Sequence, residues 1–307
     1  MIHTQLALLQ RELWEHRSIY VAPLVVALLI ALMSITGQVA VSAFDTQVDL
    51  SILGASNLGE TERAAAITVV TSAISAMLMM TMAILGVFYL LDALYTERRD
   101  KSILFWRSLP ITDAETVISK LLTALVVIPL VTFAIVIVTQ VFVVAISSMW
   151  VSGRGGDGWT LIWSAAPFLD TWFATLLFFL ATPLWYMPFA GWFLFVSAWT
   201  RRSPFLIAIL PLFVVPMLER ILVGTSFFRD AIFGRFATMP LFGGFESTGI
   251  SIVEDGPPTF DADAKASLMA MIDLPAFLSD PALWVGIVVG GLLTAAAIYV
   301  RRYRDDS

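Results

Sequence analysis

The stretch Leu121–Gly153, LLTALVVIPLVTFAIVIVTQVFVVAISSMWVSG, contains no Asp, Glu, Lys or Arg. A helix needs about 20 apolar residues to cross the hydrocarbon core of a bilayer, so this stretch is long enough to span one. Five further charge-free runs are Ser18–Phe44, Ala64–Leu91, Thr171–Thr200, Ser203–Leu218 and Pro281–Val300. Of the six, only Ser203–Leu218 is too short, and its helix reaches spanning length if it continues to Gly224. The sequence therefore predicts an all-α, polytopic membrane protein.

We expect a single transmembrane domain over residues 1–307. Its six transmembrane helices are predicted at residues 18–44, 64–91, 121–149, 171–200, 203–224 and 281–300. The composition agrees, since 59% of the residues are hydrophobic, 14% are charged and the mean hydropathy is +0.86. Soluble domains contain about 25% charged residues.

The residue inventory excludes several kinds of site. The chain contains no cysteine, so it has neither disulfides nor thiolate metal ligands. Its only histidines, His3 and His16, precede the first apolar run, which excludes a buried Ser–His pair or a His-rich metal site within the membrane. We therefore expect no catalytic residue, no metal site and no enzymatic activity of the chain by itself.

The basic residues alternate from one side of the predicted helices to the other. If the N-terminus is cytoplasmic, the inner segments are 1–17, 92–120, 201–202 and 301–307. These segments hold 12 of the 18 Lys and Arg residues but only 9 of the 24 acidic residues. Cytoplasmic loops carry an excess of Lys and Arg. The pattern predicts a multi-pass protein of the cytoplasmic (inner) membrane with both termini in the cytoplasm.

Residues 1–17 have the pattern of an amphipathic helix. Ile2, Leu6, Leu9 and Leu13 recur at helical spacing, which favours a helix lying in the headgroup plane before the chain enters the bilayer. A solvated leader with accidental periodicity is the alternative.

The inner segment 92–120 carries the sharpest local signals. Helix-forming residues continue through Asp92–Asp100, so the second helix is predicted to project beyond the membrane. Thr112 and Glu115 form a capping-box pattern after Pro110, so a new helix is predicted to begin at Asp113 and to run through Lys120 into the third span. The acids and bases of these two antiparallel helices are expected to pair near the membrane surface.

The turn between those helices, residues 101–109, is basic yet contains the apolar residues Ile103, Leu104, Phe105, Trp106 and Leu109. Apolar clusters rimmed by charge are typical of interfaces. The partner is either lipid headgroups, which suit Trp and Arg, or a soluble protein. Physical reasoning alone leaves both open.

The order TERRDKSIL (residues 96–104), SLPIT (108–112), ETV (115–117) and KLL (120–122) resembles the hallmark of ABC-2-type transporter permeases. In that family an E-R-x-x-G-T-L-like stretch leads to L-P-V-S/T, then to E-hydrophobic and K-L-L. The matching positions here are Glu97, Arg98, Pro110, Thr112, Glu115 and Lys120. The chain departs from the pattern at Lys101-Ser102, where Gly-Thr is common. The leader LQRELWE (9–15) also resembles the family's N-terminal elbow helix.

The resemblance implies a permease that works as a dimer, with a second copy or a related chain, and with two cytosolic ATPase subunits. Residues 92–120 would be the coupling segment, containing a coupling helix that receives the ATPase stroke. The implied coupling residues are Glu97, Arg98, Arg99, Lys101, Ile103, Leu104, Phe105, Trp106, Arg107, Pro110, Thr112, Glu115 and Lys120. The apolar turn would then dock the ATPase.

The chain cannot be its own ATPase, because none of its three lysines lies in a Gly-Lys-Ser/Thr phosphate loop. ATP and Mg²⁺ are therefore expected on the partner and no cofactor on this chain. Membrane lipid is an expected partner and nucleic acid is not. The resemblance implies export, and the sequence does not choose among peptide, lipid, drug and other cargoes.

Several residues suggest a substrate pathway without establishing one. Thr68, Thr71, Ser72 and Ser75 lie in the outer half of the second span, and small hydroxylated faces serve either helix packing or substrate contact. The remaining pathway candidates are Met79, Met82, Pro211, Pro216 and Glu219, which offer an adaptable apolar surface, helix kinks and an ionisable group at the membrane boundary.

Residues 225–280 are predicted to form an outer-face loop. It would contain an interfacial or re-entrant helix, residues 227–242, and a short helix near Ala262–Ile272. The alternative function is an ion-coupled secondary transporter or a channel-like protein without an ATPase. That class usually shows intramembrane charges and internal repeats.

Overall fold

The computed structural model describes residues 2–36, 59–101, 111–241, 250–251, 259–260 and 267–303. The described chain is all-helical except for two strands of two residues, β1 (Ile250–Ser251) and β2 (Thr259–Phe260), which pair antiparallel. Six helices in it are long and apolar enough to cross a membrane, which confirms the prediction of six spans by length and composition. The predicted span residues 37–44 lie outside the described residues.

The first half of the chain contains α1 (Ile2–Glu15), α2 (Ser18–Ile35), α4 (Glu60–Ala93), α5 (Tyr95–Arg99), α7 (Asp113–Leu122) and α8 (Ile128–Gly153). A π-helical turn, Thr123–Val127, joins α7 to α8, so the two form one continuous apolar segment. The second half contains a π-turn at Trp159–Trp163, then α9 (Phe168–Trp185), α10 (Met187–Trp199), α11 (Pro204–Leu222), α12 (Phe227–Ala237), a 3₁₀ turn at Met269–Met271, α13 (Leu274–Ser279) and α14 (Pro281–Tyr303).

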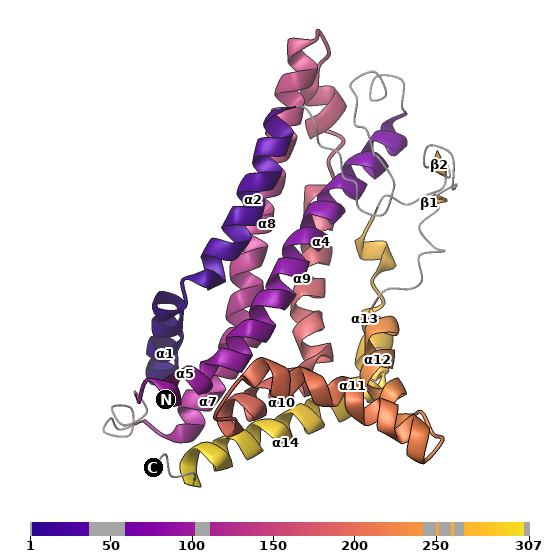
Figure 1. Cartoon of the computed structure of the whole chain (residues 1–307). Coiled ribbons are helices and arrows are strands. Elements are labelled where there is room, and N and C mark those ends of the chain that lie inside the picture. The colour runs from indigo at the N-terminus through magenta and orange to yellow at the C-terminus, as the bar shows by residue number, and fades with distance from the viewer. Residues whose placement is uncertain are drawn as a thin grey trace.

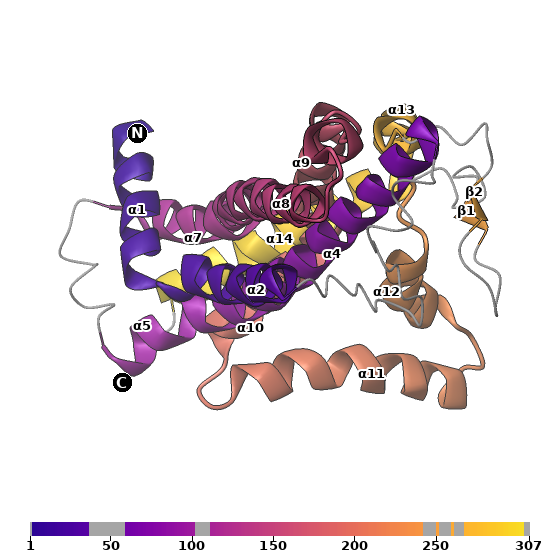
Figure 2. The same cartoon turned by 90° about the horizontal axis from the view of Figure 1, so that it is seen from above.

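The helices form one elongated bundle with distinct ends (Figure 1). Both views place α1, α5, α7 and the two chain ends at one end of the bundle, whereas α12, α13 and the β1–β2 pair lie at the other. Viewed from above, α11 stands apart from the other long helices (Figure 2). The N- and C-terminal helices therefore present their free ends on the same side of the protein. We call this end of the bundle the inner end and the opposite end the outer end, after the topology predicted from the sequence.

The predicted fourth span, residues 171–200, is not one helix. The chain breaks at Tyr186, between α9 and α10, and in Figure 1 the two helices run in different directions. Pro188 causes the break, because proline has no N–H to donate to the carbonyl four residues earlier and its ring clashes with that carbonyl. The apolar run predicted a membrane-spanning segment but not the break within it.

Around the inner segment, the predicted helix boundaries are confirmed. The second span continues as α5 to Arg99 after a one-residue break at Leu94. Helix α7 begins at Asp113, where the Thr112 side chain accepts a bond from the Glu115 N–H and the Glu115 carboxylate accepts one from the Thr112 N–H. Reciprocal capping of this kind satisfies two N–H groups that the first helical turn leaves free.

The outer segment differs in part from its prediction. Helix α12 occupies Phe227–Ala237 of the expected interfacial helix, 227–242. In place of the short helix expected near Ala262–Ile272, the described part of that stretch contains only the 3₁₀ turn, and helix α13 begins after it at Leu274. Pro275 suits the first turn of α13, where the missing N–H costs nothing.

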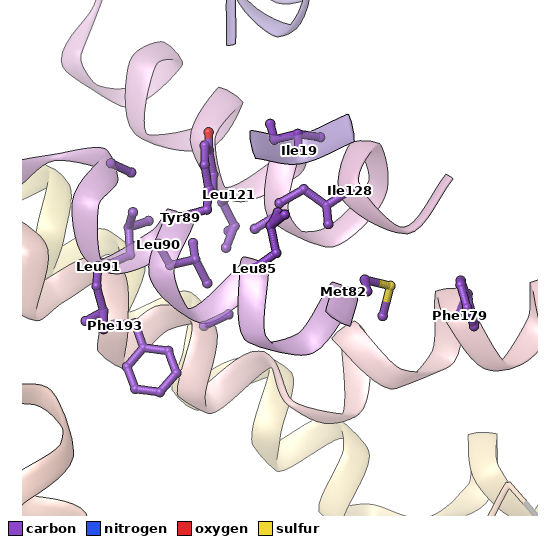
Figure 3. Close-up of a cluster of buried hydrophobic side chains, with 14 of the residues drawn as sticks. Ile19, Met82, Leu85, Tyr89, Leu90, Leu91, Leu121, Ile128, Phe179 and Phe193 are labelled. Atoms are coloured by element: carbon purple, nitrogen blue, oxygen red, sulfur yellow. The ribbon is translucent and has the colours of Figure 1, made fainter. Parts of the chain in front are cut away.

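Two kinds of packing hold the bundle together. Branched and aromatic side chains fill its inner half, where Ile19, Leu85, Tyr89, Leu121 and Ile128 meet between α2, α4, α7 and α8 (Figure 3). Helices α10 and α14 instead approach through glycine: a Cβ on Gly191 would lie 2.5 Å from the Gly290 carbonyl oxygen. Small residues let helix backbones approach closely in membrane proteins.

Candidate functional site

Five charged side chains meet at the inner end of the bundle, and we call them the charge cluster: Glu12, Glu97, Asp113, Lys120 and Arg301. The Lys120 ammonium lies 3.0 Å from a Glu12 carboxylate oxygen and 3.1 Å from a Glu97 oxygen. Arg301 donates to the other Glu97 oxygen, and its Nε donates to Asp113 at 3.0 Å. Glu97 therefore joins the two cations.

The cluster is shielded from solvent. Glu12, Lys120 and Arg301 are 2%, 1% and 4% exposed, and Glu97 is 6% exposed. Buried charges are stable only when they are paired and hydrogen-bonded, and removal of one partner is strongly destabilising. The fifth member, Asp113, is partly exposed. Each charge of this cluster has at least one partner of opposite sign, so the arrangement is a continuous chain of ion pairs from Glu12 to Asp113.

Tyr89 extends the cluster toward the apolar core. Its hydroxyl donates to the second Glu12 oxygen at 2.7 Å, and the edge of its ring contacts the His16 ring with centroids 5.1 Å apart. In Figure 3 the Tyr89 hydroxyl points away from the apolar cluster formed by its neighbours. The residue thus joins the apolar core of the inner half to the charged end.

The cluster connects four parts of the chain that are distant in sequence. Glu12 comes from α1, Glu97 from α5, Asp113 and Lys120 from α7, and Arg301 from α14. Helices α5 and α7 flank residues 102–110, the turn between the second and third spans. Both flanks of that turn are therefore tied by buried ion pairs to the first and last helices.

A second contact fixes α5 against α10. The Arg98 guanidinium donates to the carbonyls of Ser197 and Thr200, at 2.6 and 2.7 Å. In return, the Ser197 hydroxyl accepts bonds from the N–H groups of Leu94 and Tyr95, both at 3.0 Å. A cation at the last carbonyls of a helix is electrostatically favourable. The backbone N–H groups at the break between α4 and α5 thus find their acceptor on α10.

The other coupling candidates lie outside these contacts. Arg99 and Asp100 form an exposed pair, and Lys101 is exposed with a positive φ of 56°. Glu115 caps α7 instead of joining a cation. Ile103, Leu104, Phe105, Trp106, Arg107 and Pro110 lie outside the described residues.

A neutral polar cluster occupies the outer half of the bundle. The Gln140 side chain on α8 donates to the Thr71 carbonyl at 2.8 Å and to the Ser75 hydroxyl at 2.9 Å. It accepts a bond from the Trp172 indole at 2.9 Å, and Ser75 lies 3.4 Å from the Thr175 hydroxyl. These bonds join α4, α8 and α9.

The hydroxylated face of the second span packs within the protein. Thr68, Thr71 and Ser75 are buried, Ser72 is half-buried, and the hydroxyls of all four donate to carbonyls of their own helix. Helix packing, one of the two roles left open for this face, accounts for these contacts. A substrate-lining role stays a prediction.

The remaining pathway candidates are dispersed. Met82 belongs to the inner apolar core and Met79 packs against it. Pro216 is buried in α11 and Pro211 is half-buried. The Glu219 carboxylate accepts bonds from the N–H groups of Phe227 and Phe228, both at 2.8 Å, and so caps the start of α12.

Sequence reasoning missed four members of the site: Glu12, Tyr89, Asp113 and Arg301. Glu12 lies on the polar face of the amphipathic leader, and Arg301 belongs to the basic segment expected at the end of the last span. Neither pattern distinguishes a solvated charge from a buried one. The available signal was an acid or a base at the inner end of each of four helices. The expectation that acids and bases of the two antiparallel helices pair is met by Glu97 and Lys120, at 3.1 Å, but not by Glu115, which caps α7.

Comparison with known proteins identifies no relative: the chain matches no protein-family model, no curated protein and no solved structure. Among the described residues, no group of three or more His, Asp or Glu side chains is arranged to hold a metal ion.

Proposed function

We propose that the chain is the transmembrane permease subunit of an ABC-2-type transporter, energised by a separate cytosolic ATPase and exporting a substrate across the cytoplasmic membrane. The observation that carries the proposal is the charge cluster. It ties both flanks of the turn at residues 102–110 to α1 and α14 through Glu97, Lys120 and Arg301.

The cluster gives that turn a mechanical role. A force on residues 102–110 acts on α5 at one flank and on α7 at the other. Because Lys120 and Arg301 both contact Glu97, neither flank moves without straining ion pairs to α1 and α14. Buried ion pairs resist separation, since an unpaired charge in a low-dielectric site is costly. The stroke of an ATPase docked on the turn would therefore move helices as a unit.

The order of the residues that match the ABC-2 permease pattern is consistent with this role. Glu97 and Lys120, at positions that match the ABC-2 permease pattern, are paired at 3.1 Å. The amphipathic helix α1 corresponds to the elbow helix, and its Glu12 contacts Lys120. In the assembly we propose, two permease chains bind two ATPase subunits, and ATP and Mg²⁺ bind to the ATPases.

An ion-coupled secondary transporter is the competing proposal. Such proteins place their ion and substrate sites near the bilayer midplane. In the described part of this chain the charge cluster lies at one end of the bundle. The polar cluster around Gln140, between α4 and α8, contains only neutral side chains. The positions of the charges therefore favour mechanical coupling over ion transport.

The test is co-expression of the chain with candidate ABC ATPases, beginning with any that is encoded beside its gene, followed by purification through a tag on the chain and measurement of ATP hydrolysis in lipid. We expect the ATPase to co-purify and to hydrolyse ATP faster in the complex than alone. The double variant Phe105→Asp with Trp106→Asp should lose the ATPase while still inserting into the membrane.

The matched control introduces the same two charges at the opposite end of the bundle. Trp159→Asp with Thr160→Asp changes exposed residues of the outer π-turn and should leave the ATPase bound. Equal retention of the ATPase by both double variants would refute docking at residues 102–110. Failure of any ATPase to bind the unmodified chain would refute the permease proposal.

A further inference from the structure

A cavity of about 590 Å³ lies beside the charge cluster, between the inner parts of α2 and α4 and the start of α11. Its apolar wall is formed by Ala22, Ile84, Leu85, Phe88, Leu91 and Phe205. Ligand pockets for small molecules have volumes of about 300–1,000 Å³ and are mostly apolar with a few polar groups. This cavity has that size and that apolar character, and it is open on one side, since Ile84, Phe88 and Phe205 are 52%, 56% and 43% exposed.

The polar part of the wall carries a negative charge. Asp92 is the one carboxylate among the lining residues, and no Lys or Arg lines the cavity in the described chain. The lining imidazole, His16, has its Nε2 3.6 Å from a Glu12 carboxylate oxygen. One Asp92 oxygen accepts a bond from the Thr96 hydroxyl. The Arg99 guanidinium, on α5, is paired with Asp100 at 3.0 Å and lies 5.8 Å from the centre of the Tyr95 ring.

Aromatic rings line the same cavity as the carboxylate. Phe88, Tyr89 and Tyr95 lie within two turns of it on α4 and α5, and Phe205 faces them from α11. The Phe88 and Phe205 rings are stacked, with centroids 5.8 Å apart and planes 7° from parallel. Aromatic faces attract cations through the ring quadrupole, and quaternary ammonium groups are recognised in this way. A carboxylate among aromatic rings is a site for an organic cation.

The same lining argues against a phospholipid. A phosphate requires cationic or N–H donors, and here it would face the Asp92 carboxylate without a lining Lys or Arg. We propose that this cavity binds an amphiphile with an apolar body and a positively charged end that carries no phosphate. Its identification as the cargo site rests on the proposed function, whereas binding itself does not.

The test uses tetraphenylphosphonium as the probe and the purified chain in phosphatidylcholine nanodiscs, with the uptake of empty nanodiscs subtracted. We expect saturable binding of one cation per chain. Tetraphenylborate, an anion of nearly the same shape, should bind at least tenfold more weakly. Asp92→Asn should weaken cation binding at least tenfold, because it removes the charge and keeps the shape.

Two further variants separate the charge from local structure. Thr96→Val removes the hydroxyl that contacts Asp92 but keeps the carboxylate, so its affinity should stay within twofold of the unmodified chain. Ile84→Trp fills the cavity and should abolish binding. If Ile84→Trp does not fold, the comparison of Asp92→Asn with Thr96→Val still decides the question.

Three results would overturn the proposal. The first is equal affinity of Asp92→Asn and the unmodified chain. The second is equal binding of the phosphonium cation and the borate anion. The third is a tightly retained phospholipid, detected by mass spectrometry, that is lost from Ile84→Trp. Cation binding without stimulation of a co-purified ATPase would support the site and refute only its role as the cargo site. Loss of the ATPase itself would concern the permease proposal alone.

Discussion

Glu97→Gln is the sharpest test of the charge cluster, because Glu97 contacts both of its cations. The substitution keeps the size of the side chain and removes its charge. Lys120 would retain Glu12 at 3.0 Å, and Arg301 would retain Asp113 at 3.0 Å. The variant therefore detaches α5 from the network, whereas α7 stays joined to α14 through Asp113 and Arg301, and neither cation is left alone.

The expected loss follows from that geometry. Removal of one partner from a buried ion pair costs about 3–5 kcal/mol when the other is left unpaired. Here both cations keep an acid, and the amide oxygen of Gln still accepts one hydrogen bond. We therefore expect the free energy of unfolding to fall by about 3 kcal/mol, the lower end of that range.

The stability assay is unfolding in mixed micelles titrated with sodium dodecyl sulfate, and the functional assay is ATP turnover of the complex with the ATPase. Glu97→Gln should lower ATP turnover at least fivefold while the amount of co-purified ATPase stays within twofold. Asp100→Asn is the matched control. It removes an exposed acid three residues away, whose pair with Arg99 is worth under about 1 kcal/mol.

A double-variant cycle isolates the pairwise interaction. Glu97→Gln combined with Arg301→Gln should show a coupling energy of about 1–3 kcal/mol, as contacting residues in one network do. If Glu97→Gln leaves both the free energy of unfolding and ATP turnover equal to those of Asp100→Asn, the cluster neither stabilises the bundle nor transmits the stroke, and the reasoning fails.

Three further predictions concern the bundle. Gly290→Ala should destabilise the protein by about 1–3 kcal/mol in the same unfolding assay, because its Cβ would lie 2.5 Å from the Met187 carbonyl oxygen. Gly291→Ala, with nothing within 4 Å of its Cβ, should be neutral, and equal effects would contradict the close packing of α10 and α14. Gln140→Leu should cost about 1–3 kcal/mol, because it removes the acceptor of the Trp172 indole N–H and a donor to the buried Ser75 hydroxyl; unchanged stability would show that the polar cluster is dispensable. A reporter active only in the cytoplasm should work when fused at residues 100, 202 and 307 and should be silent at 50, 157 and 260, and activity at 260 would overturn the topology.

The sequence by itself determined the class of the protein and most helix boundaries. Charge-free runs longer than a bilayer is thick leave few alternatives to membrane spans, because a solitary charge at that depth is costly. The start of α7 was equally readable, since a capping box acts within one turn and needs no distant partner. A short sequence window is sufficient to predict a structural feature when the interactions that form it lie within that window.

The direction that the chain takes after a helix break could not be predicted from the sequence in the same way. The run from Thr171 to Thr200 is uniformly apolar, so hydropathy showed one span where the structure has α9, a break at Tyr186 and α10. Proline is tolerated in membrane helices when neighbouring groups satisfy the freed carbonyl. Whether Pro188 bends or breaks its helix therefore depends on the packing around it.

Only the tertiary structure decided which charges are buried. Glu12, Glu97, Lys120 and Arg301 resemble ordinary solvated charges at helix ends, and positive-inside statistics describe Arg301 as they describe the exposed Arg302. Their role arises because four helices separated by up to 289 residues converge at one end of the bundle. Desolvation is a property of that convergence, since the environment of a charge depends on everything packed around it. Local sequence carries no record of those neighbours.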